Sequence, residues 1–211
     1  MPSPEPTASP ESRIYLLRHG QSEANVKKLI ASSPAAAGES YGLTDTGRTQ
    51  VRTSVLAALA DGTLPATCRI VSSPLLRARE TAAIAAEVLG TGVRVDARLA
   101  ERGFGAFELR SDKHYDRVWS EDRANPAHER WGVESATSIL ARVTTLLREL
   151  QRPDRDDAFL LCTHGDVASV LLCATHGRSL SQHREVGAMA NGEVRRIGPV
   201  RSGGLSGLPP A

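Results

Sequence analysis

The chain has 211 residues and a mass of 22.5 kDa, which is the size of one globular domain with a single core. Its 26 Lys and Arg residues nearly balance its 24 Asp and Glu residues, so the net charge is only +2. This balance excludes the strong basic excess typical of proteins that bind nucleic acid or an acidic membrane surface, and we expect neither partner. The three cysteines, Cys68, Cys162 and Cys173, show no C-x-x-C spacing. That pattern favours reduced thiols and a cytoplasmic location.

The two ends of the chain differ in composition from the middle. Residues 1–12 are rich in Pro, Ser and Glu, and they lack the basic start and the apolar stretch of a signal peptide. We interpret them as a disordered leader, and residues 198–211, with their Gly and Pro pairs, as a flexible tail. No segment is apolar over a length that could span a bilayer. The folded domain is therefore expected over residues 13–197.

Short β-rich runs alternate with helical patterns along this domain. The expected strands are 13–17, 68–71, 93–95, 158–162 and 194–197, and the expected helices are 46–60, 75–89, 135–150 and 167–175. The helix over 46–60 has Val51, Val55 and Leu59 at steps of about one helical turn, and Thr44 or Asp45 can cap its first N–H groups. The alternation predicts a layered α/β fold. A polar segment with aromatic residues, 113–124, lies between the two halves.

Two histidines follow two of the expected strands. His19 precedes Gly20 after the apolar run 14–17, and His164 precedes Gly165 after the run 158–162. Because the carboxyl ends of strands in an open α/β sheet face one crevice, these histidines can meet although they are far apart in sequence. A lone His-Gly is more often an ordinary strand end, so the neighbouring residues must decide.

Cations and amides surround both positions. Arg18 can bind two phosphate oxygens with its planar fork, and the unprotonated nitrogen of His19 can attack phosphorus if the other ring nitrogen donates to a carbonyl. Gly20 would let the chain turn close to a ligand. Pro74 is suited to the first turn of the helix over 75–89. Arg77 then lies near the helix N-terminus, where a positive charge is unfavourable for the helix dipole, so its position is best explained by a bound anion.

The chain resembles the histidine phosphatase superfamily, in the branch that includes the cofactor-dependent phosphoglycerate mutases. The resemblance rests on an ordered set of motifs over nearly the whole folded unit. These are Arg18-His19-Gly20 with Ser22 and Asn25; Leu43-Thr44 with Gly47 and Gln50; Ser73-Pro74-Leu75 with Arg77-Ala78 and Thr81-Ala82; Leu99 with Glu101-Arg102 and Gly105; and His164-Gly165. The resemblance implies a phosphoglycerate mutase-like fold of three layers, α/β/α, around a mostly parallel sheet.

The resemblance also implies a role for each matched residue. His19 would be the nucleophile that is transiently phosphorylated, and Glu101 would give a proton to the leaving oxygen. The phosphoryl oxygens would be bound by Arg18, Asn25, Arg77 and His164, with Gly165 beside them, and Arg102 would either bind the distal part of the substrate or serve a structural role. No metal and no cofactor are implied.

Physical chemistry agrees with these roles. Phosphate monoesters are inert, and most of the acceleration must come from fixed positive charge and in-line positioning. The two arginines discourage protonation of His19 and keep it nucleophilic. A phosphate dianion bound beside Glu101 would favour the protonated carboxyl and make it an acid.

The core motif does not separate a phosphatase from a mutase, because both form phosphohistidine. Ala24 stands where mutases commonly carry Trp, and Glu108-Leu109 replaces a common Glu-Gly pair. These departures favour a phosphatase that acts on a small-molecule phosphate monoester. A 2,3-bisphosphoglycerate-dependent phosphoglycerate mutase and a non-catalytic phospho-ligand binding protein remain the alternatives. The oligomeric state is open, with a homodimer as one option.

Other histidines and the tryptophans were weighed as site residues. His176-Gly177 repeats the His-Gly pair but closes a helix, where Gly177 is best explained as a C-cap. His114, His128 and His183 have no metal-ligand spacing, and we expect structural or solvated roles. For Trp119 and Trp131, which lie in the segment where the family commonly inserts substrate-facing structure, we expect packing.

Overall fold

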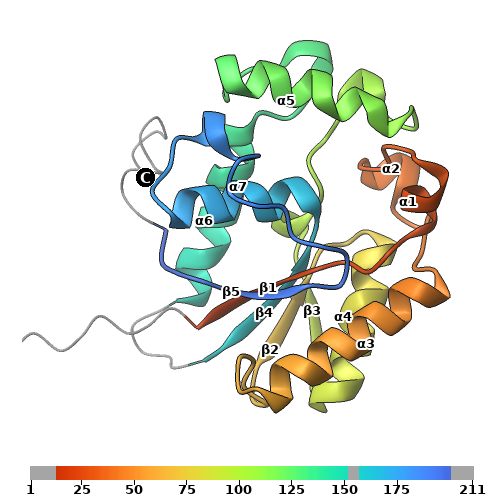
Figure 1. Cartoon of the computed structure of the whole chain (residues 1–211), viewed down its shortest axis with the longest axis vertical. Helices are drawn as coiled ribbons and strands as arrows, with labels where there is room; N and C mark the ends of the chain where they lie inside the picture. The colour runs from red at the N-terminus through yellow and green to blue at the C-terminus, as the bar shows by residue number, and fades with distance from the viewer. Residues whose placement is uncertain (1–12, 152–156, 201–211) are drawn as a thin grey trace, which may run out of the picture.

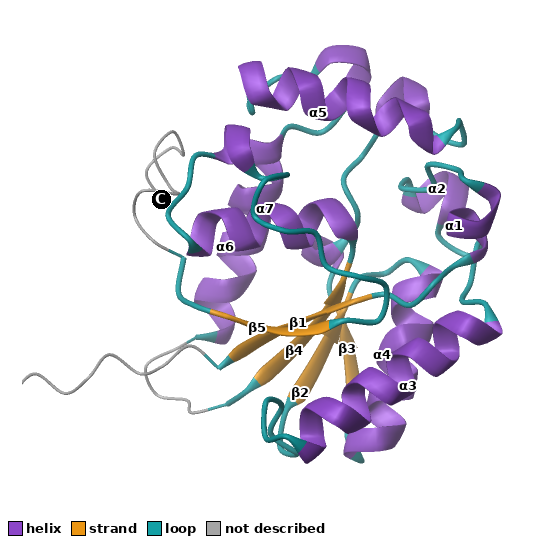
Figure 2. Cartoon of the chain, in the orientation of Figure 1, coloured by secondary structure: helices purple, strands orange, loops and turns teal. Residues whose placement is uncertain are grey.

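A computed structural model describes residues 13–151 and 157–200. The predicted leader and most of the predicted tail lie outside the described residues. Five strands form one sheet in the order β3-β2-β4-β1-β5 (Figures 1 and 2). Their bounds are β1 Ile14–Arg18, β2 Arg69–Ser72, β3 Val93–Val95, β4 Phe159–Thr163 and β5 Val194–Ile197. All neighbours pair in parallel except β5, which is antiparallel to β1, so the prediction of a mostly parallel sheet is confirmed.

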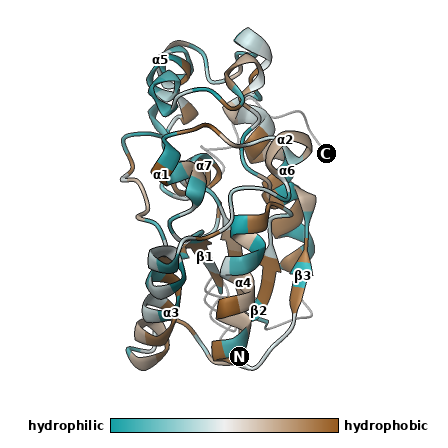
Figure 3. Cartoon of the chain, turned by 90° about the vertical axis from the view of Figure 1, so that its right-hand side faces the viewer, coloured by the Kyte–Doolittle hydropathy of each residue, from teal (hydrophilic) through white to brown (hydrophobic). Residues whose placement is uncertain are grey.

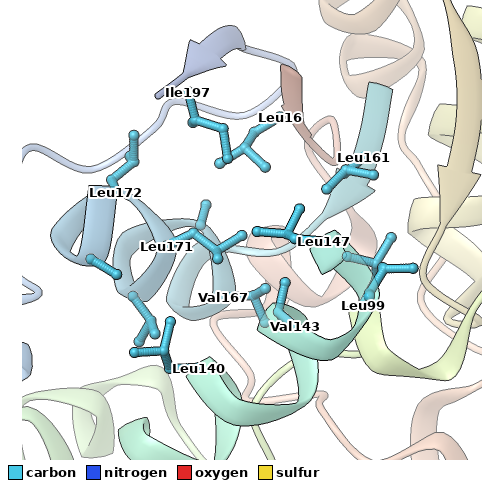
Figure 4. Close-up of a cluster of buried hydrophobic side chains, with 14 of the residues drawn as sticks. Leu16, Leu99, Leu140, Val143, Leu147, Leu161, Val167, Leu171, Leu172 and Ile197 are labelled. Atoms are coloured by element: carbon cyan, nitrogen blue, oxygen red, sulfur yellow. The ribbon is translucent and has the colours of Figure 1, made fainter. Parts of the chain in front are cut away.

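The long helices cover both faces of the sheet. Helices α3 (Asp45–Ala60) and α4 (Leu76–Leu89) lie on one face, and α6 (Ala136–Leu150) and α7 (Gly165–Thr175) lie on the other (Figure 1). Alternate residues of each strand point to opposite faces, which divides the core in two. The α6–α7 side takes Leu16 and Leu161 (Figure 4), and the α3–α4 side takes Leu17 and Leu160. The expected three-layer fold is confirmed.

The predicted strands and long helices agree with the structure to within one or two residues. Two short helices were not predicted, α1 (Glu23–Lys27) and α2 (Pro34–Ala37), because four or five residues show too little periodicity. Single turns of 3-10 helix occur at Ala97–Leu99, Gly105–Phe107, Asp112–His114, Arg130–Gly132 and Leu180–Gln182. The expected place of Pro74 was wrong, because α4 begins at Leu76 and its N-cap is Leu75.

Helix α5 (Tyr115–Ala124) arises from the polar segment. It lies apart from the sheet and from the two helix layers that cover it, above the carboxyl ends of the strands (Figure 1). It is hydrophilic along most of its length (Figure 3). Its buried Val118 packs in a small separate cluster with Ile30, Phe104, Phe107 and Val133. Among the described helices, none has the length and apolar character required to traverse a lipid bilayer.

Candidate active site

Two histidines meet where β1 and β4 end. In the parallel register Arg18 lies beside Thr163, so the next residue of each strand, His19 and His164, enters the same space. Their ring centroids are 5.1 Å apart. Both side chains are almost fully buried. The structure therefore brings together the two His-Gly motifs that the sequence placed at two strand ends.

The hydrogen bonds of His19 define which ring nitrogen is free to react. Nδ1 lies 2.8 Å from the carbonyl oxygen of Gly20. A carbonyl only accepts, so we assign the ring proton to Nδ1, which leaves the lone pair on Nε2. The Nε–H of Arg77 donates to this Nε2 over 3.2 Å. Burial, followed by the charges of Arg77 and Arg18, holds the pKa of His19 well below its usual range.

Close backbone packing holds the loop that carries His19. A Cβ on Gly20 would lie 2.3 Å from the carbonyl oxygen of Gly47, and a Cβ on Gly47 would lie 2.1 Å from the carbonyl oxygen of Gln21. Both positions therefore require glycine because the loop crosses the first turn of α3. The amide of Gly20 also donates to Thr81 Oγ1 at 3.3 Å. Gly20 is thus explained by this crossing rather than by the close approach of a ligand.

Several donors around His19 have no partner in the described part of the chain. They are Arg18 Nε, Arg77 Nη1 and His164 Nδ1, where we assign the His164 ring proton to Nδ1 with the Ser73 hydroxyl donating to Nε2, and all three atoms are buried. Other atoms of the same side chains are held firmly, since Arg18 Nη1 donates to the carbonyl oxygen of Met189 at 2.5 Å and His164 Nε2 lies 2.7 Å from Ser73 Oγ. Buried donors without acceptors are costly. An anion with several oxygens would satisfy them.

Asn25 and Gly165 also lie at this pocket. The side-chain oxygen of Asn25 accepts hydrogen bonds from the backbone N–H of Ser22, at 3.0 Å, and from its hydroxyl, at 3.1 Å, within the capping box of α1. This leaves the Asn25 amide nitrogen as its remaining donor. Gly165 is the first residue of α7, and a Cβ there would lie 3.7 Å from the guanidinium of Arg18.

Glu101 lines the pocket beside these groups. Its Oε1 accepts the backbone N–H of Arg102 at 2.9 Å. Burial, with the charge of Asp166 as the next cause, raises the pKa of Glu101 to about 7. From the sequence, we expect a bound phosphate to favour the protonated carboxyl. Burial and Asp166 provide that effect in the protein itself, before any ligand is present.

Arg102 does not line the pocket, which corrects its expected role in binding the distal part of a substrate. Its side chain is completely buried, and it donates two hydrogen bonds, of 2.6 and 2.9 Å, to the carboxylate of Asp122 on α5. The same carboxylate lies 3.0 Å from His128 Nε2 and 3.1 Å from His183 Nε2. We call Arg102, Asp122, His128 and His183 the Asp122 cluster. It joins the Glu101 loop, α5 and the segment after α7.

Four polar or aromatic residues of the pocket wall were not predicted as site residues from the sequence. Tyr115 and Trp119 come from α5, Asp166 follows Gly165, and Arg184 follows His183. Asp166 carried a signal, its place directly after the second His-Gly pair, and Trp119 lies in the segment where the family commonly inserts substrate-facing structure. Trp119 packs as expected, but it does so in the pocket wall, with its Nε1 donating to Asp166 at 3.1 and 3.2 Å.

The remaining histidines lie elsewhere. His114 stacks on Phe107, and His176 is exposed at the end of α7, where Gly177 has a positive φ of 68° as a C-terminal glycine should. Within residues 13–151 and 157–200, no three His, Cys, Asp or Glu side chains are grouped so as to hold a metal ion.

Comparison with known proteins identifies the family. The model of the histidine phosphatase superfamily (branch 1) matches residues 14–205. The chain belongs to this superfamily. It is 31% identical over 196 residues to the glucosyl-3-phosphoglycerate phosphatase of Mycobacterium tuberculosis, with 85% of this chain and 82% of that protein covered.

A second relative has a different named substrate. The protein of Hydrogenobacter thermophilus named "Putative phosphoserine phosphatase 2" is 31% identical over 175 residues, with 80% of each chain covered. Among solved structures, mycobacterial glucosyl-3-phosphoglycerate phosphatase in complex with VO3 matches with a TM-score of 0.71 and 27% identity, over 86% of this chain and 90% of that chain. The named activities of these relatives are phosphatase activities.

Proposed function

We propose that this protein is a metal-independent phosphatase that hydrolyses a small phosphate monoester through a phosphohistidine intermediate on His19. The observation that carries the proposal is the set of buried donors without partners, Arg18 Nε, Arg77 Nη1 and His164 Nδ1, around the reactive Nε2 of His19. A phosphoryl group placed there has its oxygens bound and its phosphorus next to the nucleophile. Positioning and fixed positive charge are what phosphoryl transfer requires of a protein.

In the first step the monoester exchanges partners with the protein. Arg77 gives up its hydrogen bond to His19 Nε2 and donates to phosphoryl oxygens instead. The lone pair of Nε2 then forms the N–P bond while the bond from phosphorus to the alcohol oxygen breaks. Glu101, whose raised pKa keeps much of it protonated at neutral pH, gives its proton to the departing oxygen.

In the second step water restores the enzyme. Glu101 is now a carboxylate and accepts a proton from a water molecule, whose oxygen attacks phosphorus as the N–P bond breaks. Inorganic phosphate leaves, and Nε2 regains its lone pair. The hydrogen bond from His19 Nδ1 to the carbonyl oxygen of Gly20 fixes the ring through both steps, so the same nitrogen always faces phosphorus.

The test follows inorganic phosphate release from a panel of monoesters, with chelator present throughout. We compare the wild type with His19→Ala and with His176→Ala, a matched control because His176 is exposed at the far end of α7. The proposal expects chelator-resistant release that His19→Ala abolishes and His176→Ala retains. It also expects a phosphoenzyme that is detected in base-quenched samples and is lost when the sample is acidified, as phosphohistidine is.

Three results would contradict the proposal. Loss of release on chelation would indicate a metal-dependent phosphoesterase. Formation of 2-phosphoglycerate from 3-phosphoglycerate with 2,3-bisphosphoglycerate present, and with little free phosphate, would indicate a mutase. Binding of monoesters with no turnover and no phosphoenzyme would indicate a non-catalytic binding protein.

A further inference from the structure

Beyond the phosphoryl-binding groups, the pocket wall contains a stack of three side chains. The guanidinium of Arg184 lies 3.8 Å from the centre of the Trp119 ring, and the Tyr115 ring lies parallel to Trp119 at 5.1 Å. Two groups this close cannot share one face of the indole, so they cover opposite faces. The Nε1 of Trp119 is taken by Asp166. Trp119 is therefore a support, and the groups it presents to the pocket are Tyr115 and Arg184.

Arg184 is held by one nitrogen and leaves the others available. Its Nη1 donates to Asp166 Oδ1 at 3.2 Å and to Ser169 Oγ at 3.4 Å. Its Nε and Nη2 make no hydrogen bond with any residue that the structure describes, and the side chain, which is 24% exposed, lines the pocket. Asp166 does not depend on Arg184, because it also accepts from Trp119 and from Arg102 Nη1, at 3.4 Å.

Arg184 therefore differs in setting from the other two arginines of the pocket. Arg18 and Arg77 lie against His19, and their charges act directly on its ring. Arg184 comes from the segment after α7 and packs against Trp119 of α5, in the part of the pocket wall that includes Tyr115. The pocket is small, about 100 Å³, which suits a short alcohol better than a drug-sized one.

We propose that Arg184 binds a carboxylate on the alcohol half of the substrate, so that the preferred substrates are phosphate esters of short hydroxy acids. The inference rests on the proposed function, because it concerns the second half of the same substrate. A guanidinium binds a carboxylate through two parallel N–H bonds and an ion pair, whereas a hydroxyl offers one acceptor oxygen and no opposite charge. The open edge of Arg184, held over the Trp119 ring, is preorganised for the first kind of ligand.

The experiment uses pairs of monoesters that differ in the carboxylate alone. 3-Phosphoglycerate and glycerol 3-phosphate share a three-carbon skeleton and differ at one end, and phosphoserine and phosphoethanolamine differ by loss of the carboxylate. For each pair we measure the ratio of kcat/KM values in the wild type, Arg184→Gln, Arg184→Lys and Arg117→Gln. Arg117 is the control, because it lies on α5 but stacks over Trp131, 4.4 Å from its centre, and is not part of the pocket wall.

We expect the wild type to prefer the carboxylate member of at least one pair, and Arg184→Gln to reduce that preference about tenfold or more, as loss of a charged hydrogen bond should. Arg184→Lys should restore part of it, and Arg117→Gln should leave it unchanged. Equal losses for both members in Arg184→Gln would assign Arg184 to the phosphoryl group and overturn the inference.

Two further outcomes separate this inference from the proposed function. If p-nitrophenyl phosphate is hydrolysed through His19 but neither pair shows a preference for its carboxylate member, the inference is wrong and the phosphatase remains. If no monoester, p-nitrophenyl phosphate included, is hydrolysed through His19, the proposed function fails and the inference fails with it.

Discussion

Replacement of Glu101 by Gln should stabilise the folded protein above pH 7 while it removes the proposed proton donor. Burial is the main reason why the pKa of Glu101 is about 7, against 4.5 for an ordinary Glu. The folded state thus holds this proton more tightly than the unfolded state. The resulting stabilisation is fully present below pH 4.5 and is lost as pH rises through about 7. Glutamine resembles the protonated acid in shape but has no charge to bury.

The magnitude follows from the two pKa values. Each tenfold change in a dissociation constant corresponds to about 1.4 kcal/mol, so ionisation of Glu101 costs the folded protein at most about 3 kcal/mol at pH 8. Glu101 faces the pocket, where water screens part of its charge, so we expect Glu101→Gln to gain about 1 to 3 kcal/mol at pH 8. The gain at pH 5 should be much smaller.

Urea unfolding of the wild type and Glu101→Gln at pH 5 and pH 8 measures this difference. Glu149→Gln is the control, because hydrogen bonds from Arg98 and Arg94 lower the pKa of Glu149, and its removal should bring no gain at high pH. A Glu101→Gln effect of the same size at both pH values would refute the argument, since a change that does not depend on pH cannot come from ionisation of this carboxyl.

The same carboxyl should control the rate. Under the proposed function, kcat/KM of the wild type should fall about tenfold for each pH unit above about 7, and Glu101→Gln should lose about 10²- to 10⁴-fold of the activity. His19 should not contribute a fall toward acid near pH 6.5, because burial and two arginines hold its pKa well below that value. A rate profile with an acid limb at the ordinary histidine pKa, after correction for ionisation of the substrate, would contradict this account.

Two further substitutions test how the site is held. Asp122→Asn should cost about 3 kcal/mol or more in urea unfolding, because it leaves the buried charge of Arg102 without its bidentate partner; a cost below about 1 kcal/mol would show that the pair is not needed. Gly47→Ala should reduce both stability and activity, because its Cβ would meet the carbonyl oxygen of Gln21 at 2.1 Å and displace the loop of His19. Gly47→Ala with unchanged thermal unfolding and kcat would show that the loop moves freely.

Much of the sheet and the half of the pocket proposed to bind the phosphoryl group could be predicted from the sequence, for a physical reason. The central strands β1 and β4 are short apolar runs buried on both faces, and the long helices have regular apolar faces. The groups that would bind the phosphoryl oxygens follow those strands directly or begin the next helix, as Arg77 does. Their positions in space therefore follow from the strand order, and sequence order is enough to bring them together.

The other half of the pocket could not be predicted because its residues are placed by contacts between distant polar groups. Arg102 follows Glu101 and has the charge of a ligand-binding residue, but its partner Asp122 lies on a helix whose sequence is mostly polar. No periodicity marks one carboxylate of α5 as buried. Arg184 lies outside helices and strands, and nothing near it in sequence shows that it rests on Trp119.

This difference suggests how one pocket can combine a common chemistry with a particular substrate. The groups proposed to bind the phosphoryl oxygens are attached to the ends of β1 and β4 and to the start of α4, where the core fixes their spacing. The wall made by α5 and Arg184 is joined to that framework through the Asp122 cluster, whose members come from three separate segments. Substitutions in the wall made by α5 and Arg184 can alter which alcohol is bound, while His19 and Glu101 keep their geometry.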